Sequence, residues 1–401
     1  MRTVIVSLWV ASLLVTACYS GLAGSDPTTE TDAEGSTGTT TDAPADGSST
    51  VASTTSTTVD PDGTTTVDPD GTTDESTGAP PAEPGIHWVG RFDDTDPAGV
   101  RMGWSGVGLV ARFDGTGATV RMDDAGRYFT VLVDGMLQPT LATSTGMQDY
   151  VLASGLPAGE HVIELYRRTE GSFGPTVIEQ VTIDGELLAP PPVARRMEII
   201  GDSISCGYGN EGVSPCSFSA QTENHYMTYG AIAARAVGAE LHTVAWSGKG
   251  MVYNFGDDVN QPLPELYDRT IASSGDPWSF DWQPDVVAVN LGTNDFSTDG
   301  DPPQPLFTDA YVEFLGHLRD VYPGAFLLVL QPSLFGAEND MVQGYLMDVV
   351  AQVQAGGDSN VAYADVNVTW IGSGCDGHPT VATHEGMAGR LVQELQAHLG
   401  W

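Results

Sequence analysis

The sequence predicts an α/β fold with a parallel sheet covered by helices, preceded by a small antiparallel β-sandwich domain. From residue 196 onward, short continuous apolar runs alternate with segments of helical periodicity, a pattern typical of strands that are buried on both faces. Before residue 192, short strand-like runs are separated by Asp-Gly turns instead. We therefore expect four parts: a signal peptide over residues 1–17, a linker over 18–85, a β-sandwich over 86–192 and the α/β domain over 193–401.

The N-terminus has the features of an export signal. Arg2 precedes an apolar run, and the run ends in Val-Thr-Ala-Cys, which resembles the lipobox of bacterial lipoproteins. Cleavage before Cys18 would leave a thiol for lipidation, whereas an ordinary secretory signal is the alternative. We expect an extracytoplasmic protein, lipid-anchored to a bacterial membrane, whose residues 18–85 form a disordered acidic linker rich in Ser, Thr, Pro and Gly.

The overall charge excludes one class of partner. The 401 residues include 15 lysines and arginines against 53 aspartates and glutamates, which gives a formal charge of -38. Such a polyanion is a poor ligand for nucleic acid, so we expect no nucleic-acid partner. We also expect a monomer. Lys249, the single lysine, either attracts an anionic sugar or pairs with a carboxylate.

Three cysteines remain for an oxidising compartment. Cys206 and Cys216 are ten residues apart, and three glycines between them let the chain turn back, so we predict a disulfide between these two. Cys375 is then the unpaired thiol.

The sandwich region contains no obvious catalytic trio. Its strand-like runs cover residues 108–113, 118–122, 128–133, 161–166 and 177–183. Trp88, Trp104 and Tyr128 suggest either a platform for sugar rings or ordinary core aromatics.

The α/β region begins with the strand that leads to Ser203. Buried strands are predicted over residues 285–291 and 325–330, and helices over 226–237, 341–353 and 384–399. Sites in such sheets lie beyond the carboxyl ends of the strands. The polar residues that follow the predicted strands are Ser203, the glycine block with Gly248, the Gly-Thr-Asn-Asp segment with Asn294, and the Asp-Gly-His-Pro segment with His378.

These residues supply the parts that ester hydrolysis needs. Ser203 is the candidate nucleophile and His378 the candidate base, while the backbone N–H groups of Ser203 and Gly248 and the Asn294 amide can bind an oxyanion. His378 precedes a proline in a loop, whereas His384 opens a helix and fits a capping or core role better. Because no His-x-His or His-x-x-x-His spacing occurs, we expect neither a metal nor another cofactor.

The order of these motifs resembles that of the SGNH (GDSL-type) hydrolases, and in particular carbohydrate esterase family two. The segments that carry the resemblance are residues 201–210, 222–226, 247–250, 290–296 and 376–379, behind a sandwich that ends in Arg-Arg-Thr-Glu at 167–170. The resemblance implies a jelly-roll-like sandwich followed by a flavodoxin-like SGNH domain, and removal of acetyl groups from xylan and other plant polysaccharides. In the wider superfamily an aspartate stands three residues before the histidine. That place is Cys375 here, so either Asp376 or a backbone carbonyl orients His378.

We therefore expect a serine esterase that removes O-acetyl groups from xylan or glucomannan through an acetyl-enzyme, with acetylated polysaccharide or oligosaccharide as its partner. Two alternatives remain. One is a carbohydrate-binding lipoprotein with a vestigial site, and the other is an esterase that acts on peptidoglycan or lipid esters.

Overall fold

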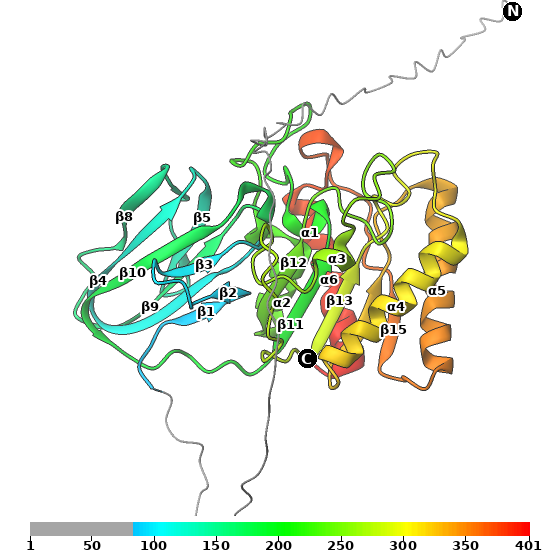
Figure 1. The fold of residues 1–401 in the computed structure, drawn as a ribbon. Helices are drawn as coiled ribbons and strands as arrows, with labels where there is room; N and C mark the ends of the chain where they lie inside the picture. The colour runs from blue at the N-terminus through cyan, green and yellow to red at the C-terminus, as the bar shows by residue number, and fades with distance from the viewer. Residues whose placement is uncertain (1–82) are drawn as a thin grey trace, which may run out of the picture. The chain divides into compact units, whose positions relative to one another are not determined.

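The computed structural model describes residues 83–401, all within one compact unit (Figure 1). The expected signal peptide, Cys18 and nearly all of the expected linker lie outside the described residues. None of the described helices has the length and apolar character that crossing a bilayer would require.

The first half of this unit is an antiparallel sheet domain. Its main path runs β2-β3-β10-β4-β9-β5-β6, with β1 and β8 paired to β4, and β7 paired to β5. The strands are β1 His87–Val89, β2 Phe92–Asp93, β3 Val100–Met102, β4 Gly108–Asp124, β5 Tyr128–Val133, β6 Met136–Leu137, β7 Leu141–Ala142, β8 Gly146–Ala153, β9 Gly159–Arg167 and β10 Thr176–Leu187. Leu109, Ala111 and Phe113 alternate along β4 and are fully buried, so the residues between them, such as Arg112, lie on the opposite face of the strand.

The second half is a parallel five-stranded sheet in the order β12-β11-β13-β14-β15. The strands are β11 Arg196–Gly201, β12 Glu240–Ala245, β13 Val286–Asn290, β14 Phe326–Leu330 and β15 Val361–Ala364. Gly201 pairs in register with Ala245 on one side and with Asn290 on the other. The carboxyl ends of three strands therefore stop at the same level, and the segments that follow them meet at one edge of the sheet.

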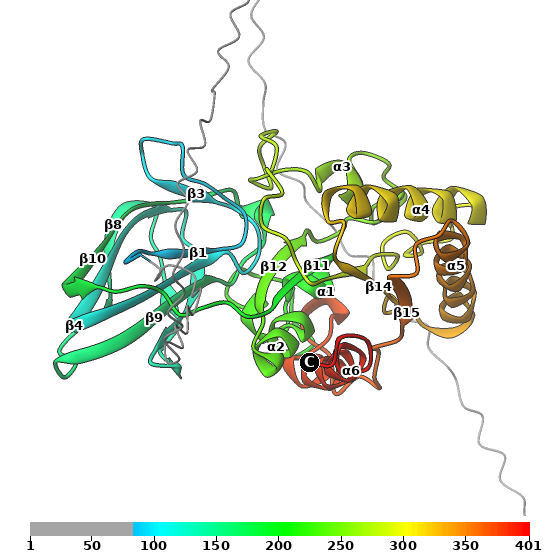
Figure 2. The same ribbon diagram turned by 90° about the horizontal axis from the view of Figure 1, so that it is seen from below.

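Helices cover both faces of this sheet (Figure 2). The helices are α1 Ser203–Cys206, α2 Tyr229–Val237, α3 Leu263–Leu266, α4 Gln304–Val321, α5 Gly336–Ala355 and α6 Val381–Leu399. Helices α2 and α6 pack together on one face, and α4 and α5 pack together on the other. On α6, Met387, Leu391 and Leu395 form the buried stripe, and each such side chain contributes about 1.5–3 kcal/mol when it is fully buried.

The predicted fold class is thus confirmed: an antiparallel domain precedes an α/β domain with a parallel sheet. The predicted helices correspond to α2, α5 and α6, and the strands predicted at 285–291 and 325–330 correspond to β13 and β14.

Candidate active site

Ser203 stands where β11 ends and the short helix α1 begins. The Asp202 side chain caps this helix by accepting a hydrogen bond from the N–H of Ile204 at 3.0 Å, and Gly207 ends it with a φ of 84°. A side chain at Gly201 would lie 2.1 Å from the Ser205 hydroxyl oxygen, so only glycine allows this sharp passage from strand to helix. The turn delivers the Ser203 hydroxyl to the edge of the sheet.

His378 meets that hydroxyl from the other end of the chain. Its Nε2 lies 2.8 Å from Oγ of Ser203. Burial lowers the pKa of His378 below its ordinary value, and this effect outweighs the carbonyl groups of Asp376 and Cys375, which raise it. The imidazole is therefore neutral at neutral pH and can accept a proton from the serine.

The Asp376 carboxylate makes no hydrogen bond to the imidazole, and Nδ1 of His378 has no hydrogen-bond partner among the described residues. Its Oδ2 instead accepts hydrogen bonds from the Tyr208 hydroxyl at 3.1 Å and from the N–H of Phe218 at 2.8 Å. Asp376 has a φ of 50°, in the left-handed region. The backbone of Asp376 and Cys375 and the charge of the Asp376 carboxylate all raise the pKa of the ring, so Asp376 and a backbone carbonyl both stay candidates for orienting it.

The three predicted oxyanion donors come from neighbouring strand ends. Gly248 follows β12 and has a φ of 79°. The side-chain amide of Asn294 follows β13, where it donates to the carbonyl of Lys249 at 2.8 Å and lies 3.4 Å from the Asp202 carboxylate, next to Ser203. Burial raises the pKa of Asp202 to about 7. The assignment of Ser203, Gly248 and Asn294 as donors stays a prediction, and this proximity is consistent with it.

Asp295 has a role that the sequence analysis missed. Its carboxylate accepts hydrogen bonds from the backbone N–H groups of Met251, Val252 and Tyr253 at 2.7–2.8 Å. Burial raises the pKa of Asp295, while these N–H groups act in the opposite direction. The sequence feature that could have pointed to this role is the position of Asp295 directly after Asn294.

The disulfide joins Cys216 and Cys375, whose Cα atoms are 4.7 Å apart, and Cys206 is free and buried. The prediction of a Cys206–Cys216 bridge is therefore wrong. Cys206 belongs to α1 and points into the interior, whereas a side chain at Gly212 would collide with both bridged sulfurs. The glycine makes room for the bridge, and the bridge ties the histidine loop to the segment after Ser203.

Aromatic rings gather beside the Ser203–His378 pair. The Tyr208 ring lies 4.2 Å from the His378 ring, and it stacks on Phe218 at 3.9 Å. Of the aromatics named as a possible sugar platform, Trp104 is fully buried and Trp88 packs against the core, which favours the core interpretation for both. Nζ of Lys249 donates to the carbonyl oxygen of Asn260 at 3.0 Å.

Among the described residues, one group of side chains has the composition of a metal site. Ligand atoms of Glu170, Cys206 and Glu223 lie within 4.8 Å of one another, and all three residues are buried. They are far apart in the sequence, so no spacing could reveal them. The Glu170 carboxylate already accepts hydrogen bonds from the N–H of Ser247 and the hydroxyl of Ser172.

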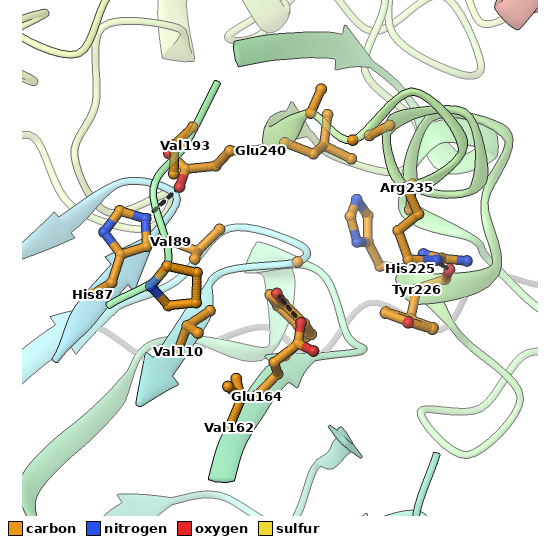
Figure 3. Close-up of a pocket in the computed structure, with 18 of the residues that line it drawn as sticks. His87, Val89, Val110, Val162, Glu164, Val193, His225, Tyr226, Arg235 and Glu240 are labelled. Carbon is orange, nitrogen blue, oxygen red and sulfur yellow. Dashed lines mark hydrogen bonds and ion pairs between the residues drawn. The ribbon is translucent and has the colours of Figure 1, made fainter. Parts of the chain in front are cut away.

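A cavity of about 340 Å³ lies away from the Ser203–His378 pair, between the antiparallel sheet and α2 (Figure 3). Its polar side chains are paired with one another. The Tyr166 hydroxyl donates to Glu164 at 2.7 Å, and the Arg235 guanidinium covers the Tyr226 ring at 3.7 Å. No predicted catalytic residue lines it, so the serine–histidine pair defines the candidate active site.

Comparison with known proteins gives two family matches. Residues 88–192 match the family described as Carbohydrate esterase 2 N-terminal, and residues 199–386 match the GDSL-like Lipase/Acylhydrolase family. The chain is 39% identical over 328 residues to the cellulase/esterase CelE of Acetivibrio thermocellus. The matched region covers 79% of this chain and 40% of that protein. It is 26% identical over 330 residues to an acetylxylan esterase / glucomannan deacetylase of Cellvibrio japonicus, covering 80% of this chain and 90% of the relative.

Solved structures agree with these matches. A family two carbohydrate esterase from Clostridium thermocellum in complex with cellohexaose superposes with a TM-score of 0.76 at 38% identity, covering 79% of this chain and 100% of that one. A family two carbohydrate esterase from Cellvibrio japonicus superposes with a TM-score of 0.74 at 26% identity. The match covers 80% of this chain and 97% of that one.

Proposed function

Because the chain belongs to carbohydrate esterase family two and is a carboxylic ester hydrolase, we propose that it removes O-acetyl groups from xylan or glucomannan. The observation that carries the proposal is the 2.8 Å contact between Ser203 and the part-buried His378 at the carboxyl edge of the parallel sheet. The names of the Cellvibrio relatives support the substrate class.

The reaction has two steps. In the first, Oγ of Ser203 attacks the acetyl carbonyl carbon while Nε2 of His378 takes the hydroxyl proton. The resulting imidazolium returns this proton to the sugar oxygen, the ester bond breaks and an acetyl-enzyme remains. In the second step, His378 takes a proton from water, which attacks the acetyl-enzyme, and the imidazolium returns a proton to Ser203 as acetate leaves.

Charge on the carbonyl oxygen develops only at the tetrahedral stage of each step. The N–H groups of Ser203 and Gly248 and the Asn294 amide are the donors in this proposal, and they act most strongly because the site is buried. The backbone of Asp376 and Cys375, together with the charge of the Asp376 carboxylate, favours the imidazolium that forms in both steps.

The sugar would lie against the aromatic rings of Tyr208 and Phe218. Tyr208 is stacked between Phe218 and His378, so in this proposal its edge and the outer face of Phe218 border the sugar whose acetyl group must reach Ser203. The cellohexaose complex of a relative favours a second candidate function, carbohydrate binding without turnover. The intact Ser203–His378 contact favours catalysis, because binding alone requires neither group.

An extracytoplasmic location with a lipid anchor at Cys18 remains part of the proposal. It rests on the Val-Thr-Ala-Cys segment alone. Fractionation of cells that express Cys18→Ala tests it: the protein should move from membranes into the soluble fraction, and an unchanged distribution would contradict the anchor.

The central test measures acetate release from acetylated xylan, glucomannan and peptidoglycan by wild type and Ser203→Ala. We expect release from the plant polysaccharides without added metal, and a fall on the order of 10⁴- to 10⁶-fold in the variant. Ser205→Ala, two residues further along α1, removes a hydroxyl that contacts only the Tyr229 hydroxyl and should retain most of the activity. Activity that survives in Ser203→Ala, or that a chelator abolishes, would rule out a metal-independent serine esterase.

A further inference from the structure

Glu170 belongs to the antiparallel domain, yet its carboxylate contacts the loop that carries Gly248. It lies three residues beyond the end of β9 and is 4% exposed. One carboxylate oxygen accepts a hydrogen bond from the N–H of Ser247 at 2.6 Å, and the other accepts from the Ser172 hydroxyl at 2.7 Å. A short hydrogen bond from a buried N–H to a carboxylate is roughly twice as strong as one between neutral groups.

The loop that contains Ser247 and Gly248 is fixed at three points. Glu170 holds its first N–H, at Ser247. Asn294 holds its middle through the carbonyl of Lys249, and Asp295 holds its end through three consecutive N–H groups. We call residues 247–253 the oxyanion loop. Because Gly248 lies between the first two points, Glu170 and Asn294 together determine where its N–H is directed.

Glu170 is itself held rigidly. The turn that follows it packs closely against the segment that contains Ala272, since a side chain at Gly171 would come within 2.3 Å of the Ala272 methyl group. The N–H of Glu170 donates to the Glu223 carboxyl at 3.2 Å, and the Arg167 guanidinium donates to its carbonyl at 2.7 Å. Burial first, and then the charge of Glu170, raises the pKa of Glu223 well above its ordinary value.

We propose that Glu170 is a positioning residue for ester hydrolysis: it anchors the oxyanion loop at Ser247 and so directs the N–H of Gly248 at the developing oxyanion. The antiparallel domain then contributes to the chemical step as well as to the fold. This inference rests on the proposed serine-esterase function, since it gives Gly248 the role of donor.

The test is Glu170→Gln in the full chain, assayed on 4-nitrophenyl acetate. Glutamine keeps the size and an acceptor but removes the charge. We expect kcat to fall by about ten- to a hundredfold, because the donor acts mainly in the transition state, while KM changes much less. The matched control is Glu164→Gln, a part-buried glutamate on β9 that contacts the Tyr166 hydroxyl, and it should retain wild-type kinetics.

Ser172→Ala is a milder variant in case Glu170→Gln folds poorly. It removes the second hydrogen bond to the Glu170 carboxylate, at an exposed position, and should lower kcat by about two- to tenfold with an unchanged melting temperature. A lower melting temperature with unchanged kcat in either variant would make the role purely structural and overturn the proposal.

A double-mutant cycle with Asn294→Ala tests whether Glu170 lowers or raises kcat through the oxyanion loop. If both residues act through the oxyanion loop, the kcat loss from Glu170→Gln should shrink to a few fold in the Asn294→Ala background. Fully additive losses would overturn the proposal. Wild-type protein that fails to hydrolyse aryl acetate would contradict the proposed function itself, whereas active wild type with an equally active Glu170→Gln contradicts only this inference.

Discussion

The two ends of strand β11 differ in what their buried charges do. Near its start, Glu198 contacts Arg91 of the antiparallel domain, and just past its end Ser203 lies beside the loop that Glu170 of the same domain contacts. Five residues separate Glu198 from Ser203, about 16 Å along a strand. Both contacts join the domains through a buried glutamate, but only the second lies next to reacting groups.

The remote contact forms a closed network, which we call the Arg91 network: Arg91, Glu198 and Tyr267. Arg91 donates to Glu198 at 3.0 Å, the Tyr267 hydroxyl donates to the other carboxylate oxygen at 2.7 Å, and the guanidinium lies 4.5 Å from the Tyr267 ring centre. No atom of this network borders the Ser203–His378 pair. The comparison teaches that similar contacts between domains can serve stability at one end and turnover at the other.

The largest expected effect comes from disrupting the Arg91 network, near the start of β11. Arg91→Met keeps much of the apolar volume but leaves the Glu198 carboxylate buried and without its cation. Loss of one partner of a buried ion pair costs about 3–5 kcal/mol of unfolding free energy. Guanidinium unfolding should show this loss, while kcat measured well below the transition should stay near the wild-type value.

Arg121→Met is the control for Arg91→Met. Arg121 pairs with Glu179 and Asp149 on the exposed surface of the antiparallel sheet, where ion pairs contribute little. Its unfolding curve should coincide with that of wild type. A large fall in kcat for Arg91→Met would show that the two ends of β11 are coupled and would refute the distinction.

The second prediction concerns pH at the catalytic end. The proposed base must be neutral, and burial places the pKa of His378 below its ordinary value of 6.5. The plot of kcat/KM against pH should therefore be flat above 6.5 and fall about tenfold per unit below a midpoint that is itself lower than 6.5. A midpoint near 7 would point to Asp202 instead, whose pKa burial raises to about 7.

The smallest expected effect tests whether the carboxylate of Asp376 takes part in catalysis. Asp376→Asn changes a carboxylate two residues from the base, yet its contacts are only the Tyr208 hydroxyl and the N–H of Phe218. Asparagine can accept both hydrogen bonds, so kcat should change by no more than a few fold. Steady-state kinetics on aryl acetate measure this. A loss of about 10⁴-fold, typical of a true orienting carboxylate, would restore Asp376 to the catalytic set.

Features that the sequence could predict are local. Continuous apolar runs identified β13 and β14, and the proline after His378 distinguished this loop histidine from His384, which is buried in the core beside Tyr229. The rule that sites lie beyond strand ends placed Ser203 and His378 together, because it depends only on the order of the strands.

Features that the sequence could not predict depend on contacts between distant segments. Cys206 and Cys216 were paired for their proximity in the sequence, but a helix directs Cys206 inward while the histidine loop brings Cys375 to Cys216. Glu170 and Glu223 lie in segments that carry the family resemblance, but nothing local shows that Glu170 contacts both Glu223 and Ser247, because these contacts require both domains to be folded. The hydrogen bonds of Asp376 to Tyr208 and Phe218 likewise join segments that are far apart in the sequence.

The distance along the chain between the nucleophile and its base also constrains when activity can begin. Ser203 and His378 are 175 residues apart, and the base stands just before the last helix, α6. A ribosome that has synthesised the serine must still add every element from β12 to β15 before the histidine exists. In the proposed mechanism, a chain interrupted during synthesis therefore carries the nucleophile without its base, and we expect ester cleavage to start only when the segment around His378 has been made and packed.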